Sequence, residues 1–344
     1  MTVNGTSASI LVPVLNEEVH LERSVRAMLD QSFAGGVEVL IVDGRSTDAT
    51  REIAGRLARE DPRVRLLDNP ARRTPNALNI ALAEAKGEYV VRMDAHTLYP
   101  RDYVARAVER LQAGGVEWVS GPQVPVGEGP WSRRVALALD TPMGMGGAAF
   151  RNATSEIEVD TGFTGVWLRE TLVRHRGWDE AWPVNQDSEL AARIRRSGGK
   201  IVCLPEMAAR YVPRDSLRAL ARQYWRYGQY RAKTSGRHPQ SMRRSHVLAP
   251  ALALTAVAAL AASRPLKGAA RLGIGAYAAG LLAGTAHAAR STEGPLGDVA
   301  ALPLVYATMH FAWGAGFIVG SARFGPPISA FARQLGLPKA GDQA

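Results

Sequence analysis

Two potential metal ligands, Asp94 and His96, stand one residue apart just after the mostly apolar run of residues 88–93. The run predicts a buried strand, and open α/β sheets bind ligands beyond the carboxyl ends of their strands. A carboxylate and an imidazole at such a point can hold a divalent cation against a diphosphate. A two-residue pattern is a weak motif, so a solvated turn is the alternative.

Two further sites with the right chemistry precede this one in the chain. Asp43 ends the apolar run of residues 37–43 and could accept hydrogen bonds from a uracil or a ribose. Its alternative role is to cap the following helix. Arg72 and Arg73 lie near a predicted helix start, and guanidinium groups pair with phosphate. A solvated basic loop is the alternative there.

Asp187 opens a predicted helix that continues to Arg196. A helix start favours an anion, so this carboxylate is expected to be ionised at neutral pH. It could serve as a general base, and the alternative is a capping role alone. Glu189 and Arg193, four residues apart, are predicted to form a pair on the helix surface.

The elements that position these residues follow an alternating pattern. Apolar runs at residues 9–13, 37–43, 64–67 and 88–93 are each followed by a segment with helical character, which predicts a doubly wound sheet. Later runs at 116–121, 158–167 and 200–204 predict three more strands, and the glycine- and methionine-rich residues 129–151 predict a mobile loop. The first strand lacks a Gly-x-Gly-x-x-Gly fingerprint and no Walker loop is present, which argues against both of those nucleotide sites.

Composition and charge point to an anionic partner. The chain has 344 residues and a net charge of +10, and its single cysteine, Cys203, allows no disulfide within the chain. Residues 1–9 do not resemble a secretory signal. Nine Lys or Arg against one Asp in residues 214–244 give that segment 9 − 1 = +8. Because apolar segments follow directly, a membrane surface is favoured over nucleic acid.

The C-terminal third is predicted to associate with a membrane. Arg214, Arg218, Arg222 and Arg226 form one stripe of a basic amphipathic helix. Apolar stretches follow at residues 247–262, 272–289 and 299–322. Of these the third is long enough to span a bilayer, the second is marginal and the first is short. Loop charges suggest that the second and third form a hairpin with the acidic loop 290–298 outside and that the first is re-entrant or interfacial.

Four ordered motifs resemble those of the family 2 glycosyltransferases. They are residues 13–17, 42–50, 78–81 and 92–96. Within the family, the chain is most similar to the membrane-associated bacterial glucosyltransferases of succinoglycan biosynthesis. The resemblance covers roughly residues 7–230. It implies a GT-A fold, a nucleotide-diphosphate sugar as donor and inversion at the anomeric carbon.

The resemblance also assigns roles to individual residues. It gives the segment with Pro13, Val14, Asn16 and Glu17, together with Asp43, to the nucleoside, and Asp94 and the residue two positions on to the diphosphate and a Mg²⁺ or Mn²⁺ ion. The predicted donor-binding set also includes Arg72, Asn76, Arg92, Gln223 and Arg226.

Two positions depart from the family pattern. Many members carry Asp where this chain has His96, and a histidine suits Mn²⁺ better than Mg²⁺. Where members usually show Glu-Asp, this chain has Gln186-Asp187. The family's base is therefore retained as Asp187. A neutral neighbour removes like-charge repulsion, which predicts a lower pKa for Asp187.

The sequence thus predicts an α/β GT-A fold on a doubly wound mixed sheet, with C-terminal membrane helices. The expected divisions are a catalytic domain at 1–212, a basic interface segment at 213–245, membrane-associated helices at 246–323 and a cytoplasmic tail at 324–344. The expected partners are a nucleotide-diphosphate sugar, with a UDP-sugar preferred, a lipid-linked glycan acceptor and the inner membrane. Nucleic acid is not an expected partner. A nucleotidyltransferase and a non-catalytic sugar-nucleotide-binding membrane protein are the alternative functions.

Overall fold

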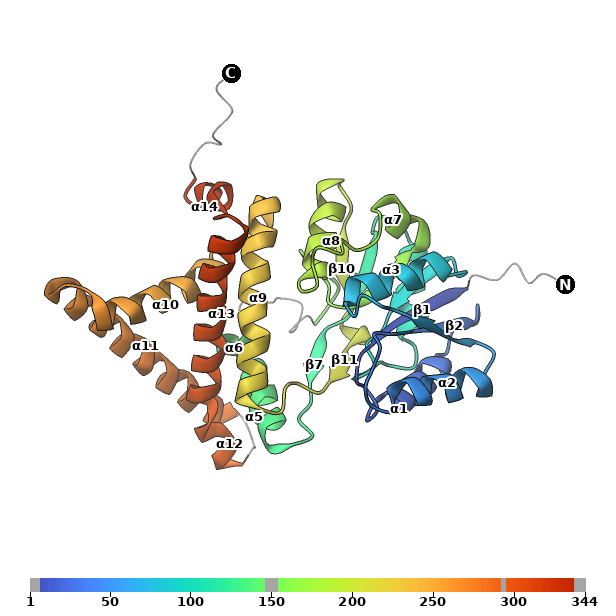
Figure 1. The fold of residues 1–344 in the computed structure, drawn as a ribbon, viewed down its shortest axis with the longest axis horizontal. Helices are drawn as coiled ribbons and strands as arrows, with labels where there is room; N and C mark the ends of the chain where they lie inside the picture. Colours follow the sequence, from blue (N-terminus) through green and yellow to red (C-terminus); the bar gives the residue numbers. More distant parts are fainter. Residues whose placement is uncertain (1–6, 146–153, 292–294, 337–344) are drawn as a thin grey trace, which may run out of the picture. The chain divides into compact units, whose positions relative to one another are not determined.

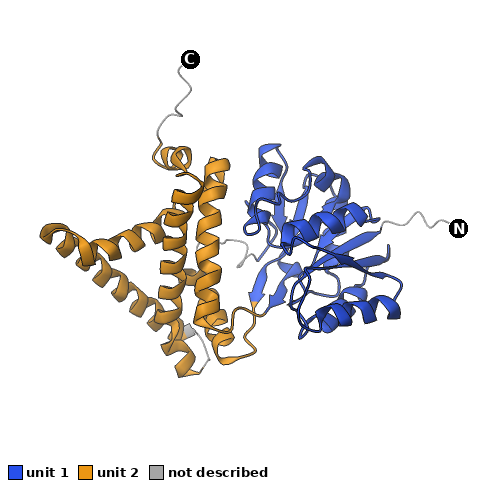
Figure 2. Cartoon of the chain, in the orientation of Figure 1, with its two compact units in different colours: residues 1–124, 149–211 blue, residues 125–148, 212–344 orange. Residues whose placement is uncertain are grey.

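The chain forms two compact units (Figure 2). The computed structural model describes residues 7–145, 154–291 and 295–336. Unit 1 comprises residues 1–124 and 149–211, and unit 2 comprises residues 125–148 and 212–344. The second segment of unit 1 ends at residue 211, and unit 2 resumes at residue 212. Residues 125–148 differ from expectation, because they belong with the C-terminal helices rather than with the catalytic domain.

Unit 1 is built on an eight-stranded mixed sheet with the order β3-β2-β1-β4-β9-β6-β10-β8 (Figure 1). β1 pairs in parallel with β2 and β4, whereas β9 is antiparallel to both of its neighbours. The strands are β1 (Ala8–Val14), β2 (Val37–Asp43), β3 (Val64–Asp68), β4 (Tyr89–Arg92), β6 (Trp118–Ser120), β8 (Ile157–Glu158), β9 (Gly165–Leu168) and β10 (Ile201–Cys203).

Helices cover both faces of this sheet. Along β1, Ile10 and Val12 pack into one apolar layer and Leu11 into the other, because successive side chains of a strand point to opposite faces. The first layer includes α1 (Leu21–Leu29), α2 (Thr50–Glu60) and α4 (Tyr103–Gln112). The second includes α3 (Thr74–Glu84), α7 (Arg169–Arg174) and α8 (Gln186–Arg196).

The strand predicted at residues 158–167 is divided into β8 and β9, which lie apart in the sheet. Trp167 on β9 is fully buried, with its ring centroid 4.8 Å from that of Trp118 and 5.8 Å from that of Trp178. It therefore belongs to the core, as expected for an aromatic residue inside a strand. A second sheet joins β5 (Thr97–Leu98), β11 (Ala209–Tyr211) and β7 (Gln123–Pro125).

Unit 2 is helical. It contains α5 (Pro130–Leu139), α6 (Pro142–Met145), α9 (Leu217–Arg237), α10 (Ser245–Ala261), α11 (Arg264–Ser291), α12 (Leu296–Ala300), α13 (Leu302–Phe324) and α14 (Ile328–Gln334) (Figure 1). The sequence prediction of a mobile loop at 129–151 is wrong for residues 130–145, since two helices form there. Ser132 caps α5 at Gly129, and Val135 and Leu139 are buried. The rest of that prediction lies outside the described residues.

Two segments of unit 2 are long and apolar enough to cross a membrane, namely Arg264–Arg290 and Leu296–Phe324. The helix Ser245–Ala261 is apolar but shorter. The three apolar stretches expected from the sequence therefore form helices. The third is again the best suited to span a bilayer, the second less so, and the first is short.

Candidate active site

A buried arginine joins the two carboxylates that the sequence singled out. Arg92, the last residue of β4, donates from Nε to Asp94 Oδ1 (3.0 Å) and from Nη1 to Asp187 Oδ1 (2.6 Å). Its Nη2 lies 3.3 Å from Asp94 Oδ2. The three residues are 4, 6 and 8% exposed, respectively. The structure thus brings Asp187, the predicted base, and Asp94, the predicted ligand of the diphosphate and the metal, to the guanidinium group of Arg92.

The sequence led us to expect that Arg92 binds the donor directly. Instead, its guanidinium is engaged by Asp94 and Asp187, and its Cζ lies 5.5 Å from the centre of the Phe163 ring. Burial acts to lower the pKa of Arg92, but the two carboxylates raise it above its ordinary value. Arg92 therefore stays charged and can hold both acids in place.

The environment of Asp187 differs from expectation. Burial raises its pKa from 3.8 to about 6, the positive charge of Arg92 opposes the rise, and the nearby negative charge of Asp94 adds to it. The prediction of a lowered pKa is wrong, because it considered the neutral neighbour Gln186 and not the loss of solvent. Asp187 does not act as a helix cap, since Asn185 occupies that position and the Asp187 carboxylate binds Arg92.

His96, the second predicted metal ligand, contacts the loop that follows β1. Its Nδ1 lies 3.0 Å from Glu17 Oε1. Glu17 had been assigned to the nucleoside, so this contact ties the first binding loop to the tip of β4. Among the described residues, no group of three or more His, Cys, Asp or Glu could hold a metal ion.

The donor set nevertheless fits a cation bound together with a diphosphate. An ionised carboxylate has about four acceptor positions, so the hydrogen bonds from Arg92 leave Asp94 able to ligate. An imidazole from His96 could add a second ligand. The remaining ligands of such an ion would be phosphate oxygens, as is common for Mg²⁺ and similar hard cations.

The loops after β1 and β2 are tied together by hydrogen bonds. Asn16, with a positive φ of 58°, donates its backbone N–H to Ser46 Oγ (2.9 Å) and accepts from the backbone N–H of Thr47 (2.8 Å). Val14, at the end of β1 after Pro13, accepts from the Gly44 N–H. This edge is thus preformed where the resemblance puts the nucleoside.

Asp43 lies at the end of β2 and is fully buried. Its carboxylate accepts from the backbone N–H of Ser46 (3.2 Å) and from Arg51 Nη1 (3.2 Å). It therefore fixes the turn after β2 and does not cap α2, whose N-cap position is Ala49.

The residues near α3 divide into two groups. Arg72 is exposed and adopts a positive φ of 57°, and its role toward a phosphate stays a prediction. Asn76, in contrast, donates to Glu180 Oε2 (2.5 Å), and its role toward the donor stays a prediction.

Asn79 and Glu180 were not among the predicted site residues. Asn79 accepts from the Trp178 backbone N–H (2.9 Å) and donates to the Trp178 carbonyl (2.8 Å) and to Glu180 (3.2 Å). Together with Asn76 it fastens the segment that leads to Asp187. The only sequence signal for this role was Asn79 itself, inside the motif of residues 78–81.

The predicted surface pair on α8 is not on the surface, because Glu189 is buried and Arg193 is partly buried. Glu189 is fully buried and receives Arg193 Nη2 at 2.7 Å. Arg193 also donates to the backbone carbonyls of His175 and Gly177. Helical spacing alone does not tell which face a pair occupies, and here that face packs on the turn before the Asp187 loop.

We expect Glu189→Ala to destabilise the protein by about 3 kcal/mol, because it leaves the partly buried Arg193 charge without its carboxylate partner. Chemical unfolding of the purified full-length protein measures this loss. Arg106→Ala is the matched control. It breaks an exposed pair with Asp102 of the same i,i+4 type and should cost less than about 1 kcal/mol. Equal losses in the two variants would contradict the structural role of Glu189.

Gln223 and Arg226 lie on α9 in unit 2, where Gln223 Nε2 donates to Tyr227 Oη (2.9 Å). Their assignment to the donor site stays a prediction.

Comparisons with known proteins agree with this geometry. Residues 9–173 match Glycosyl transferase family 2. The chain is 35% identical over 317 residues to the succinoglycan biosynthesis protein ExoA of Rhizobium meliloti, with 92% of this chain and 95% of that protein covered. It is also 31% identical over 88 residues to a GalNAc(5)-diNAcBac-PP-undecaprenol beta-1,3-glucosyltransferase of Campylobacter jejuni, covering 25% of this chain and 28% of that one.

Among solved structures, the mannosyltransferase PcManGT from Pyrobaculum calidifontis, in complex with GDP-Man and Mn²⁺, is similar at 25% identity and a TM-score of 0.58. The alignment covers 94% of this chain and 88% of that one. The mixed sheet, the strand-tip carboxylates and an ExoA-like sequence along nearly the whole chain lead to one conclusion: the protein is an enzyme of glycosyl transferase family 2, with a GT-A fold.

Proposed function

We propose that the protein is an inverting glycosyltransferase that moves a sugar from a nucleotide-diphosphate donor to a lipid-linked or polysaccharide acceptor. UDP-sugars are the first candidate donors and GDP-sugars the second. The observation that carries the proposal is the buried group in which Arg92 holds Asp94 and Asp187. In this proposal, Asp94 serves the diphosphate and Asp187 serves the acceptor.

In the proposed reaction, Asp187 accepts the proton of the acceptor hydroxyl as the hydroxyl oxygen bonds to the anomeric carbon of the sugar. The bond between that carbon and the diphosphate oxygen breaks on the opposite face. The nucleoside diphosphate leaves with the electron pair, so the anomeric configuration inverts. Arg92 keeps the Asp187 carboxylate oriented throughout.

A divalent cation, Mn²⁺ before Mg²⁺, would be held by Asp94 and His96. When bound, it would neutralise charge on the departing diphosphate. The Mn²⁺ in PcManGT and the oxygen and nitrogen ligands offered here support this assignment. Arg72 would contact phosphate, and the loops with Pro13, Asn16 and Asp43 would hold the nucleoside.

The proposed location is the cytoplasmic face of the inner membrane. Nucleotide sugars are made in the cytoplasm, and the two long apolar helices support membrane association. An acceptor carried on a lipid, such as the one in the name of the Campylobacter relative, would meet the enzyme at that surface.

A thermal-shift screen of nucleotide sugars with and without Mn²⁺ tests the donor site. The correct donor at about 100 times its Kd should raise Tm by roughly 5 °C. Asp94→Ala should lose the Mn²⁺-dependent part of the shift, whereas the exposed control Asp102→Ala should keep it. An intact Mn²⁺-dependent shift in Asp94→Ala would defeat the metal assignment. Release of pyrophosphate, rather than a nucleoside diphosphate, during turnover would indicate a nucleotidyltransferase.

A further inference from the structure

The most apolar long helix of unit 2, α13, lies along the basic helix α9. Gly228 of α9 meets the backbone of Trp313, and Gly316 and Gly320 of α13 meet the backbones of Trp225 and Gln229, all too closely for a Cβ. The two helices therefore run side by side and parallel, in contact through small residues (Figure 1). Because the two helices pack along each other, α9 must lie at the same depth relative to a membrane as α13.

That partnership bears on whether α13 can cross a bilayer. Within its 21 residues, α9 has no acidic residue and six basic ones: Arg218, Arg222, Arg226, Arg231, Lys233 and Arg237. Charged side chains near the middle of a transmembrane helix are expensive and rare. A basic amphipathic helix with Tyr and Trp lies instead in the membrane interface. Since α9 is unsuited to span the membrane, α13 is held at the interface with it.

An ion-pair cluster fixes the start of α13 on the catalytic side. Asp298 on α12 is 5% exposed and accepts from Arg133 Nε (3.2 Å) and Arg134 Nε (3.0 Å) on α5. Only residues 126–129 separate α5 from β7, too few to cross a hydrocarbon core about 30 Å thick. The sequence-based hairpin, which put the loop ending at Asp298 outside, does not agree with these ion pairs.

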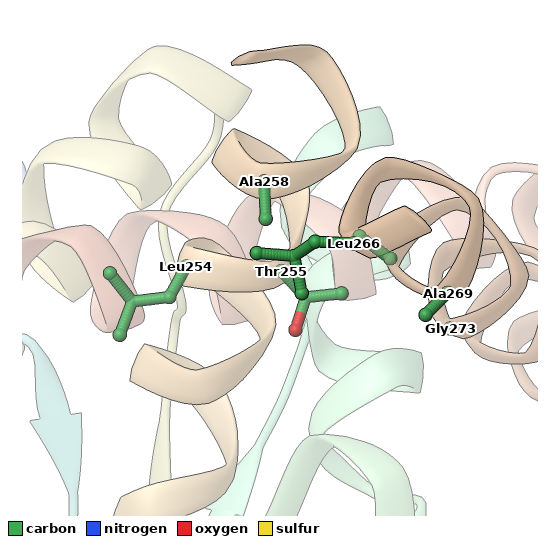
Figure 3. A pocket seen from close by; sticks show the side chains of 7 residues that line it. Leu254, Thr255, Ala258, Leu266, Ala269 and Gly273 are labelled. Atoms are coloured by element: carbon green, nitrogen blue, oxygen red, sulfur yellow. The ribbon is translucent and has the colours of Figure 1, made fainter. Parts of the chain in front are cut away.

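The α10–α11 pair presents the unpartnered apolar surface of unit 2. Its leucines and valine at positions 248, 254, 257, 260, 266, 272 and 282 are 56–77% exposed. Leu254, Ala258, Leu266 and Ala269 line an apolar hollow of about 450 Å³ between the two helices (Figure 3). Acyl chains can cover an exposed apolar surface of this kind.

Basic residues flank this apolar surface. Arg243 and Arg244 precede α10, and Arg264, Lys267 and Arg271 lie in the first turns of α11. They complement the charge of anionic lipid headgroups.

We propose that unit 2 docks on one face of an anionic bilayer, with α9 and α13 in the interface, and that α10 and α11, but not α13, enter the hydrocarbon. This rests on the membrane association in the proposed function and goes beyond it by naming the surface. The lipid bilayer is the one partner proposed for this surface.

Cysteine labelling tests the position of α13. In a Cys203→Ala background, which removes the single native thiol, Leu296→Cys and Ile328→Cys place exposed thiols beyond its two ends. Val173→Cys, exposed on α7, reports the catalytic side. In spheroplasts and in inverted vesicles, an impermeant maleimide should label all three variants from the same side. Labelling of the Leu296 and Ile328 variants from opposite sides would overturn the proposal.

Flotation with vesicles tests the apolar surface. Leu260→Glu combined with Leu272→Glu should weaken binding to vesicles containing about a third phosphatidylglycerol by at least tenfold, because charges then face the acyl chains. The control Val173→Glu should bind as the parent does. Undiminished binding of the double variant, or equal binding to purely zwitterionic vesicles, would overturn the docking surface. Neither experiment measures sugar transfer, so their failure would not refute the catalytic assignment.

Discussion

Asp187→Asn should lower kcat by roughly 10²- to 10⁴-fold with little change in the KM for the donor. The amide has the shape of the carboxylate and keeps an oxygen for Arg92, so the local structure should be retained. It cannot accept the proton of the acceptor hydroxyl. Release of nucleoside diphosphate from a labelled donor measures the effect, and unchanged turnover would refute the assignment of the base.

The pH dependence of the parent enzyme gives a second readout of the same prediction. The pKa of Asp187 is raised to about 6, so the carboxylate is protonated below that pH and ionised above it. A base must be ionised to act, and kcat should therefore rise as pH increases through about 6 and then level off. The residual activity of Asp187→Asn should lack this rise. A rise of the same size in the variant would assign the titration to another group.

Local patterns in the sequence were sufficient to place the carboxylates at strand and helix ends. Asp43 and Asp94 each follow an apolar run, and such runs form buried strands that end where polar residues begin. Asp187 was likewise placed at the start of a helix that continues to Arg196. Ordered motifs added the family, because their combination is more specific than any one of them.

What the sequence could not predict depends on contacts between distant residues. Arg92 and Asp187 are 95 positions apart, and Asn76 and Glu180 are 104 apart, so no periodicity links them. The available signal was the position of Arg92 at the end of an apolar strand, two residues before Asp94. A charged residue at such a position indicates a buried partner.

The predictions of which side chains are buried failed for the same reason, because burial depends on contacts between distant residues. Glu189 was assigned to the surface because i,i+4 spacing describes a helix and not the side that faces the core. The pKa of Asp187 was predicted in the wrong direction because the loss of solvent outweighs the identity of one neighbour. Helix α5 was missed because glycines and methionines nearby suggested a loop, whereas its apolar residues pack within unit 2.

Arg92→Met should strongly destabilise the protein. It leaves Asp94 and Asp187 buried without their shared cation, and breaking a buried ion pair in this way costs about 3–5 kcal/mol. The pKa of Asp187, which burial already raises, should then rise further, so the folded variant binds more protons than the unfolded chain above pH 4. The loss of stability should grow as pH rises and should be partly relieved at pH 5. Unfolding midpoints of parent and variant at pH 5 and pH 8 measure this.

The matched control for this prediction is Arg56→Met. Arg56 also joins two carboxylates, those of Glu22 and Glu60, but all three side chains are about 40% exposed. Its loss should cost far less stability than the loss of Arg92, because solvent screens the charges of Arg56 and its two partners. Arg92→Lys should restore part of the stability but little activity, since one ammonium cannot reproduce the fork that reaches both acids. A pH-independent loss in Arg92→Met, or full activity in Arg92→Lys, would show that Arg92 is not what holds the base in place.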